Sequence, residues 1–233
     1  MATSGTITYT QTALQLIERA LRTLGVTGVG STANANHVTN ATTALNSLLK
    51  SMQNDGVYLW TREVVNGLSL AAYSVANGQT FGTEYQKVES VQLNYQDDDT
   101  YPLEMRTIEE YMDLPRKDTD GRPTDYYTKE NLGADTFFLY PAPDDLVNYT
   151  LDFVVVRLLE DIAATSNNFD LPSRWLEALH WGLVDAICME HGKPIDFRQD
   201  VKQRYKEALR SARKSDTPVQ DRTVDPAYDT DYC

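Results

Sequence analysis

One glycine-rich segment has the spacing of a phosphate-binding loop. Residues 28–33, Gly-Val-Gly-Ser-Thr-Ala, fit the GxGxxA pattern of dinucleotide-binding proteins. In those proteins the loop follows a strand, and its glycines let a pyrophosphate approach the N-terminus of a helix. Here the preceding residues Leu14, Ile17, Leu21 and Leu24 recur at steps of three and four, which is typical of a helix face. We therefore interpret the segment as a loop between two helices and expect no cofactor.

Metal-binding and nucleophilic residues are few and widely spaced. The three histidines, His37, His180 and His191, belong to no HExxH, CxxC or paired-histidine pattern. Cys188 lies next to the apolar face of a predicted helix, where a thiol packs rather than reacts. The segment 67–71, Gly-Leu-Ser-Leu-Ala, lacks the last glycine of a hydrolase elbow. The sequence predicts neither a metal site nor a nucleophilic enzyme.

Acidic side chains are too abundant for any pair to be informative. The 233 residues include 34 Asp and Glu against 21 Lys and Arg, a formal net charge of −13. A carboxylate-pair glycosidase therefore stays open as a less favoured alternative. The negative excess opposes non-specific binding to phosphate backbones. With no membrane-spanning run, no secretory signal and two cysteines, we expect a soluble protein made in a reducing compartment.

Aromatic residues indicate contacts with other macromolecules. The chain has 14 tyrosines and 3 tryptophans, residue types that are enriched at protein interfaces. Many of them fall at the ends of predicted strands and in loops. We expect a subunit or partner interface at Trp60, Tyr126 and Tyr127. A cytosolic module that binds a peptide or carbohydrate through this surface remains an alternative.

The basic residues concentrate near the C-terminal end. Residues 193–214 contain eight Lys and Arg against three Asp and Glu. We expect Lys202, Arg204 and Lys206 to lie at a subunit or partner interface and to face an acidic surface. Because exposed charges are screened by salt, neutralising these residues is expected to weaken assembly in a salt-sensitive way.

Hydrophobic periodicity predicts helices at both ends of the chain and strands between them. The predicted helices cover about 10–25, with Thr10 as N-cap and Gly25 at the C-terminal end, and then 34–54, 171–192 and 195–214. The predicted strands lie around 68–72, 91–95, 101–105, 137–140 and 149–156, with the last two joined by a turn at 141–145. Residues 107–110, Thr-Ile-Glu-Glu, have the capping-box pattern of a further short helix, and 118–123 is expected to be a loop.

This order predicts an α+β fold in which a four-helix α scaffold is interrupted by a β-rich insertion. We expect an N-terminal helical half at 1–60, the insertion at 61–160, and a C-terminal helical half at 161–214 that shares a domain with the first. Residues 215–233 contain two prolines and five aspartates, and their apolar residues show no period. Such a composition predicts a flexible C-terminal arm.

The expected arm carries spaced apolar and aromatic residues that a purely solvating tail does not need. These residues are Val219, Val224, Pro226, Tyr228 and Tyr232. We expect them to anchor the arm as it orders on a partner.

Five segments, in order along the chain, resemble the head-to-tail adaptor proteins of tailed bacteriophages. The similarity is to the tail accessory factor group of the short-tailed phages, which includes head completion and packaged-DNA-stabilisation proteins. The matching segments are the helix end LNSLLKSMQNDGVYLW at 45–60, GRPTDYY at 121–127, LYPAPD at 139–144, LPSRWLEAL at 171–179 and the basic helix at 195–214.

The resemblance implies a non-enzymatic structural protein of the virion, made in the host cytoplasm. Such adaptors assemble as a homo-oligomeric, usually dodecameric ring beneath the portal protein. The ring extends the DNA channel, helps to retain the packaged genome until ejection, and offers a docking surface to tail nozzle, hub or fibre proteins. Double-stranded DNA passes through without sequence-specific binding, and no membrane is involved. The resemblance makes the segment 215–233 the candidate portal-binding arm. Another connector ring of the tail is the alternative within phage assembly.

Overall fold

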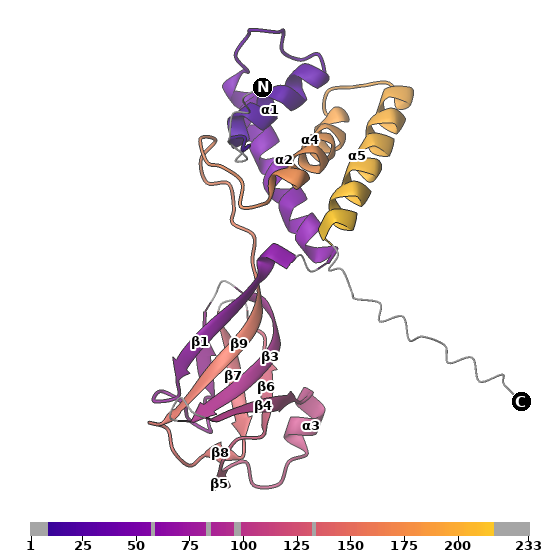
Figure 1. Cartoon of the computed structure of the whole chain (residues 1–233). Helices are drawn as coiled ribbons and strands as arrows, with labels where there is room; N and C mark the ends of the chain where they lie inside the picture. Colours follow the sequence, from indigo (N-terminus) through magenta and orange to yellow (C-terminus); the bar gives the residue numbers. More distant parts are fainter. Residues whose placement is uncertain (1–8, 57–58, 83–84, 96–98, 132–133, 217–233) are drawn as a thin grey trace, which may run out of the picture.

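The computed structural model describes residues 9–56, 59–82, 85–95, 99–131 and 134–216. Its α-helices are α1 (Ala13–Thr23), α2 (Ala35–Asn54), α3 (Ile108–Met112), α4 (Leu176–Cys188) and α5 (Ile195–Asp216). Two 3-10 helices, η1 (Leu59–Thr61) and η2 (Ser173–Trp175), lie where the chain passes between helices and strands. Figure 1 shows α1, α2, α4 and α5 gathered in a helical part, and α3 beside the strands in a β part.

The described residues of the β part form nine strands of two to eleven residues, which confirms the α+β class. The strands are β1 (Arg62–Ser69), β2 (Gln79–Phe81), β3 (Tyr85–Tyr95), β4 (Asp99–Met105), β5 (Asp120–Gly121), β6 (Asp125–Lys129), β7 (Asp135–Tyr140), β8 (Ala142–Pro143) and β9 (Tyr149–Arg157). Seven form one mixed sheet in the order β1-β9-β3-β4-β6-β7-β2, and β5 pairs with β8 in parallel.

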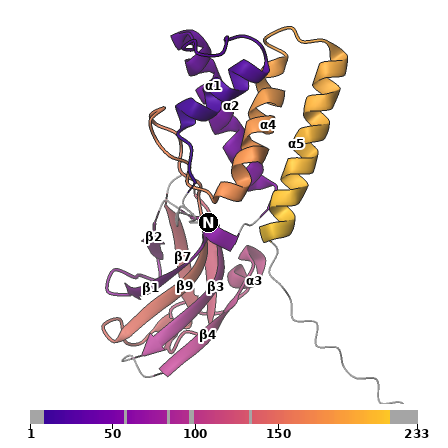
Figure 2. The same cartoon turned by 45° about the horizontal axis from the view of Figure 1, so that its top comes forward.

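The entry and exit strands of the β part are neighbours. β1 follows η1, β9 leads back toward α4, and the two pair antiparallel from Arg62 opposite Val156 to Ser69 opposite Thr150. Because the chain enters and leaves through adjacent strands, the β part is inserted between α2 and α4 without separating the helices that flank it. Figure 2 shows both strands running toward the helical part side by side.

The sheet curls so that its two edges approach. Gln79 in β2 donates a side-chain hydrogen bond to the carbonyl of Ser69 at the end of β1, at 2.8 Å. Inside the curl, Phe81 stacks on Phe153 with ring centroids 4.9 Å apart. The hydroxyl of Tyr73 donates a hydrogen bond to the Leu139 carbonyl and accepts one from the Leu139 amide, which fixes the segment after β1 to β7. Burial raises the pKa of Tyr73 to about 12. The result is an apolar core enclosed within the β part.

The helical part has a separate core built around α4. Trp175, Leu179 and Leu183 are fully buried and pack with residues of α1 and α2. Gly182 lets the helices come close, because a Cβ there would lie 2.8 Å from Leu48 in α2 and 2.9 Å from Tyr205 in α5. The predicted scaffold of four long helices is therefore present, with α4 at its centre.

Several local predictions are confirmed and others need correction. The capping box at Thr107 opens α3, and Gly25 follows α1 with a φ of +65°. The predicted N-cap Thr10 is wrong: Thr12 caps α1, because its hydroxyl accepts from the Gln15 amide while the Gln15 side chain accepts from the Thr12 amide.

The order of the strands in the sheet does not follow their order in the chain. The two strands joined by the predicted turn at 141–145 are not sheet neighbours: β7 lies between β6 and β2, and β9 lies between β1 and β3. The predicted loop at 118–123 contains β5, which pairs across the chain with β8. Sheet neighbours distant in sequence decide these contacts, and the local patterns do not reveal them.

Candidate partner-binding surfaces

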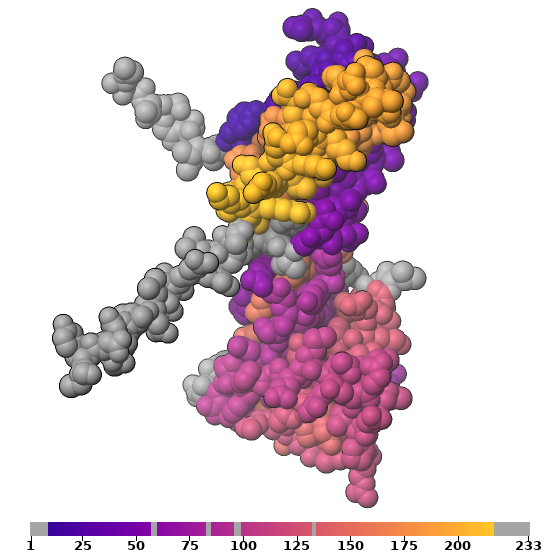
Figure 3. All heavy atoms as spheres, turned by 90° about the vertical axis from the view of Figure 1, so that its right-hand side faces the viewer, coloured from indigo at the N-terminus to yellow at the C-terminus, as the bar shows by residue number. Residues whose placement is uncertain are grey.

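The helix α5 separates an apolar face from a basic face. Its predicted apolar positions pack on α4, with Val201 and Ala212 buried and Phe197 and Ala208 partly buried. The opposite face is turned to solvent, and Figure 3 shows α5 covering much of that side of the helical part. This amphipathic division follows from the helical repeat of 3.6 residues per turn.

Four cations form a stripe along the exposed face of α5. Lys202, Lys206, Arg210 and Lys214 are spaced at i, i+4, i+8 and i+12, and all four are exposed. Residues four apart lie above one another on a helix, so the stripe is continuous. None of the four forms an ion pair within the part of the chain that the structure describes. We call these four residues the basic stripe.

The other cations of α5 near the stripe have internal roles. Arg204 pairs with Asp200 at 2.9 Å and lies over the ring of Trp181 at 5.1 Å. Arg213 pairs with Asp55 at the end of α2, at 3.2 Å. Arg204, which the sequence placed with Lys202 and Lys206 on a partner surface, is therefore engaged within its own chain. Arg210 and Lys214 continue the stripe and were missed, although their spacing was visible in the sequence.

Trp60 lies at the junction of the two parts. It is half-buried, its ring lies 5.1 Å from that of Trp175, and it packs against the helical core. The guanidinium of Arg174 lies over the Trp60 ring at 5.9 Å and pairs with the buried carboxylate of Asp216. The end of α5 is thus fixed at the same junction that joins the helices to the sheet.

Tyr126 and Tyr127 point to different environments on β6. Tyr126 is 2% exposed and belongs to the β core, and burial raises its pKa. This position corrects the expectation of a surface aromatic there, because strand alternation turns Tyr126 inward. Tyr127 is half-buried and forms a three-ring cluster with Tyr111 and Phe138, whose ring centroids lie 5.5 and 6.0 Å from its own. Of the pair, only Tyr127 has surface to offer a partner.

The expected arm at 215–233 lies outside the described residues from position 217 onward, whereas Ser215 and Asp216 belong to α5, so this helix ends two residues later than predicted. Val219, Val224, Pro226, Tyr228 and Tyr232 all follow Asp216, the last residue described.

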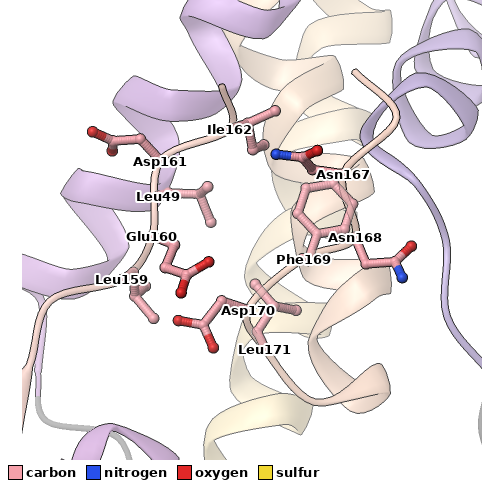
Figure 4. A pocket seen from close by; sticks show the side chains of 10 residues that line it. All are labelled: Leu49, Leu159, Glu160, Asp161, Ile162, Asn167, Asn168, Phe169, Asp170 and Leu171. Atoms are coloured by element: carbon pink, nitrogen blue, oxygen red, sulfur yellow. The ribbon is translucent and has the colours of Figure 1, made fainter. Parts of the chain in front are cut away.

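A recess of about 260 Å³ opens between α2 and the segment 159–171. Figure 4 shows the carboxylates of Glu160 and Asp170 pointing toward one another, whereas Asp161 points away. Asp170 accepts hydrogen bonds from both terminal nitrogens of the Arg157 guanidinium. These hydrogen bonds are the main reason why the pKa of Arg157 is raised. Asp170 therefore ties the segment to β9, and we assign the pair no catalytic role.

A row of polar residues on α2 holds the same segment in place. Asn46 exchanges hydrogen bonds with the backbone of Ile162, and Lys50 donates to the Leu159 carbonyl at 2.8 Å. Gln53, which is 4% exposed, accepts from the Leu159 amide and donates to the Arg157 carbonyl. The recess is thus a product of structural hydrogen bonds that satisfy an extended, partly buried backbone.

The remaining candidates for chemistry lie in the helical part. The segment 28–33 lies between α1 and α2, which confirms the interhelical loop. Cys188 is buried, and desolvation raises the pKa of its thiol. Among the described residues no group of three or more His, Cys, Asp or Glu side chains is arranged to hold a metal ion. No described helix combines the length and the apolar character needed to cross a membrane.

The described fold combines a helical scaffold, an inserted curled sheet and a basic stripe on α5. A protein-family model described as SU10 adaptor protein matches residues 11–226. The chain therefore belongs to the SU10 adaptor protein family, a family of phage head-to-tail adaptors. Its match spans both parts of the fold. The comparison with curated proteins finds no match.

Proposed function

We propose that this protein is a virion adaptor that forms a dodecameric ring beneath the portal protein. In this proposal the ring extends the DNA channel, helps to retain packaged DNA and provides the docking surface for tail proteins. The observation that carries the proposal is the family match across residues 11–226, which covers the scaffold and the insertion together. The proposal assigns the chain a structural role and no enzymatic activity.

The proposed units are the two helical halves, 1–60 and 161–214, acting as one domain, and the insertion 61–160. The adjacent strands β1 and β9 support this division, because they carry the chain into and out of the β part. We propose Trp60 and Tyr127 as contact residues for partners, since each combines a packed ring with partial exposure. Lys202 and Lys206 contact an acidic partner through the basic face of α5.

The C-terminal segment is proposed to bind the portal. Its anchors in this proposal are Val219, Val224, Pro226, Tyr228 and Tyr232. Support comes from the position of Asp216, the last described residue before this segment. Asp216 forms an ion pair with Arg174 at the junction of the two parts.

The test is a mass measurement on the purified chain, alone and mixed with the portal protein encoded by the same phage. The expected result is a low-order species alone and a closed ring on the portal. A truncation after Asp216 keeps the Arg174 contact and should abolish portal binding without unfolding the chain. If the full chain leaves the mass of the portal unchanged, the adaptor proposal fails. If only another tail ring recruits it, the chain is a different connector protein.

A further inference from the structure

The basic stripe is an exposed surface of α5 whose charges form no ion pair with the residues that the structure describes. Its first and last residues are twelve positions apart, or about 18 Å along the helix at 1.5 Å per residue. No acid of α5 pairs with it: Asp200 pairs with Arg204, Asp216 pairs with Arg174, and neither Asp196 nor Glu207 forms an ion pair among the described residues. Within the described residues the stripe therefore presents four positive charges in a line, none of them paired with a carboxylate.

Its chemistry suits a phosphate backbone better than a protein surface. Three of the four residues are lysines, which are depleted at protein–protein interfaces but bind phosphate as point charges. Protein interfaces also need apolar or aromatic anchors at their centre. Between Val201 and Asp216 no large apolar side chain is exposed in the described helix, and Leu209 beside the stripe is only partly exposed. A line of solvated cations without an anchor is typical of a polyanion contact.

The rest of the molecule would confine a polyanion to this stripe. The chain carries a formal net charge of −13, whereas residues 195–216 hold seven basic and four acidic residues. Phosphate contacts depend on counterion release by Lys and Arg and carry no sequence information. An acidic protein with one basic line can guide DNA at that line and repel it elsewhere, which allows the DNA to slide.

We propose that Lys202, Lys206, Arg210 and Lys214 form a sequence-independent contact for the phosphate backbone of double-stranded DNA. The inference rests on the proposed adaptor function for its choice of duplex DNA as the polyanion. In a ring the stripe repeats in every subunit, so that individually weak contacts add along one duplex. The stripe thus identifies the acidic partner of the α5 face as nucleic acid.

The test measures the salt dependence of binding between the full chain and a short fluorescein-labelled duplex of random sequence. Four phosphate contacts predict a slope of log K against log salt of about −3.6, which is roughly a 150-fold loss between 50 and 200 mM salt. The double variant Lys202→Gln/Lys206→Gln should reduce the slope to about −1.8. Both positions are exposed, so circular dichroism should remain that of the wild-type protein.

The matched control is Lys87→Gln/Lys129→Gln, which removes the same two charges from exposed positions in the β part. It should leave the slope unchanged. Absence of wild-type binding at low salt, or equal slopes for the stripe and control variants, would overturn the proposal. So would a stripe variant that assembles poorly on the portal yet binds the duplex like the wild type, because the stripe would then be a protein interface.

The two proposals fail separately. Portal assembly without duplex binding leaves the adaptor function standing and removes the stripe as a DNA contact. Duplex binding without portal assembly leaves the stripe standing as a DNA contact and removes the adaptor function.

Discussion

Two glycines with the same backbone angle are required for different reasons. Gly25 after α1 and Gly78 before β2 both have a φ of +65°, a region that costs other residues about 1–2 kcal/mol. A Cβ on Gly25 would meet nothing within 4 Å. A Cβ on Gly78 would lie 2.5 Å from the backbone oxygen of Phe137, which cannot rotate away. Gly78 therefore satisfies a steric demand of the sheet as well as a conformational one.

Substituting each glycine by alanine separates the two effects. Gly25→Ala should lower the free energy of unfolding by about 1 kcal/mol, and Gly78→Ala by at least about 2 kcal/mol, because the sheet must move as well. Urea unfolding of both variants measures the difference. Equal losses would show that the β2–β7 contact is not as tight as described.

His180 is a buried base in the helical core. It is 1% exposed, its Nε2 lies 3.3 Å from the Thr23 hydroxyl, and its Nδ1 has no hydrogen-bond partner among the described residues. Desolvation, with a smaller contribution from Arg19, lowers its pKa to about 4 despite the opposing charge of Glu177. The fold therefore holds this imidazole in its neutral form at neutral pH.

This shift makes stability depend on pH. The unfolded chain binds a proton at His180 near pH 6.5, whereas the folded chain binds it only near pH 4, so protonation favours unfolding. The contribution is complete above pH 6.5 and is lost as the pH falls toward 4, by up to about 3 kcal/mol. Urea unfolding from pH 7.5 to 4.5 should show this loss in the wild type and a shallower one in His180→Leu. If the free energy of unfolding fell equally with pH in the wild type and in His180→Leu, His180 would not be the source of the pH dependence.

At the scale of elements, α2 contributes a polar row as well as an apolar face. Asn46, Lys50 and Gln53 fall at i, i+4 and i+7 and hold the backbone of residues 157–162. That backbone leads from the last residue of β9 toward α4, and residues 158–162 belong to no regular element. Its hydrogen bonds therefore depend on side chains of a distant helix.

Removing one of these side chains tests the role of the row. Gln53→Leu leaves the buried Leu159 amide without its acceptor and should cost about 1–3 kcal/mol in the free energy of unfolding. Gln199→Leu, the same change at an exposed position of α5, should stay within about 0.5 kcal/mol of the wild type. If Gln53→Leu lost no more stability than Gln199→Leu, the polar row on α2 would not stabilise the fold.

The sequence reveals those elements whose signals are local. The capping box at Thr107 and the helical spacing around Leu179 need only their own segments, and both predictions are confirmed. The strands β2, β5 and β6 are short, and β5 has no apolar pattern of its own. They exist because residues far along the chain pair with them, which one sequence without its fold does not disclose.

At the scale of the whole molecule, the sequence predicts the basic face of α5, but it does not predict which of its cations form ion pairs within the chain. The charge excess at 193–214 is visible in the sequence, and so is the four-residue spacing of the stripe. Which cations are engaged depends on partners brought in by the fold, such as Asp55 for Arg213, 158 residues away. Likewise, strand alternation turns only one of Tyr126 and Tyr127 inward, and the fold decides that it is Tyr126.

The two parts of the molecule differ in charge. The helical part carries the basic stripe, whereas the described residues of the β part contain more Asp and Glu than Lys and Arg. Complementary charge on a partner would favour one part over the other. This arrangement agrees with the family of phage head-to-tail adaptors to which the chain belongs.

The most direct test of the adaptor account is an electron cryo-microscopy reconstruction of the neck of the phage that encodes this chain. The account predicts a closed ring of copies between portal and tail, with residues 217–233 bound to the portal. Absence of the chain from the neck, or its presence only in a tail fibre, would contradict the central claim.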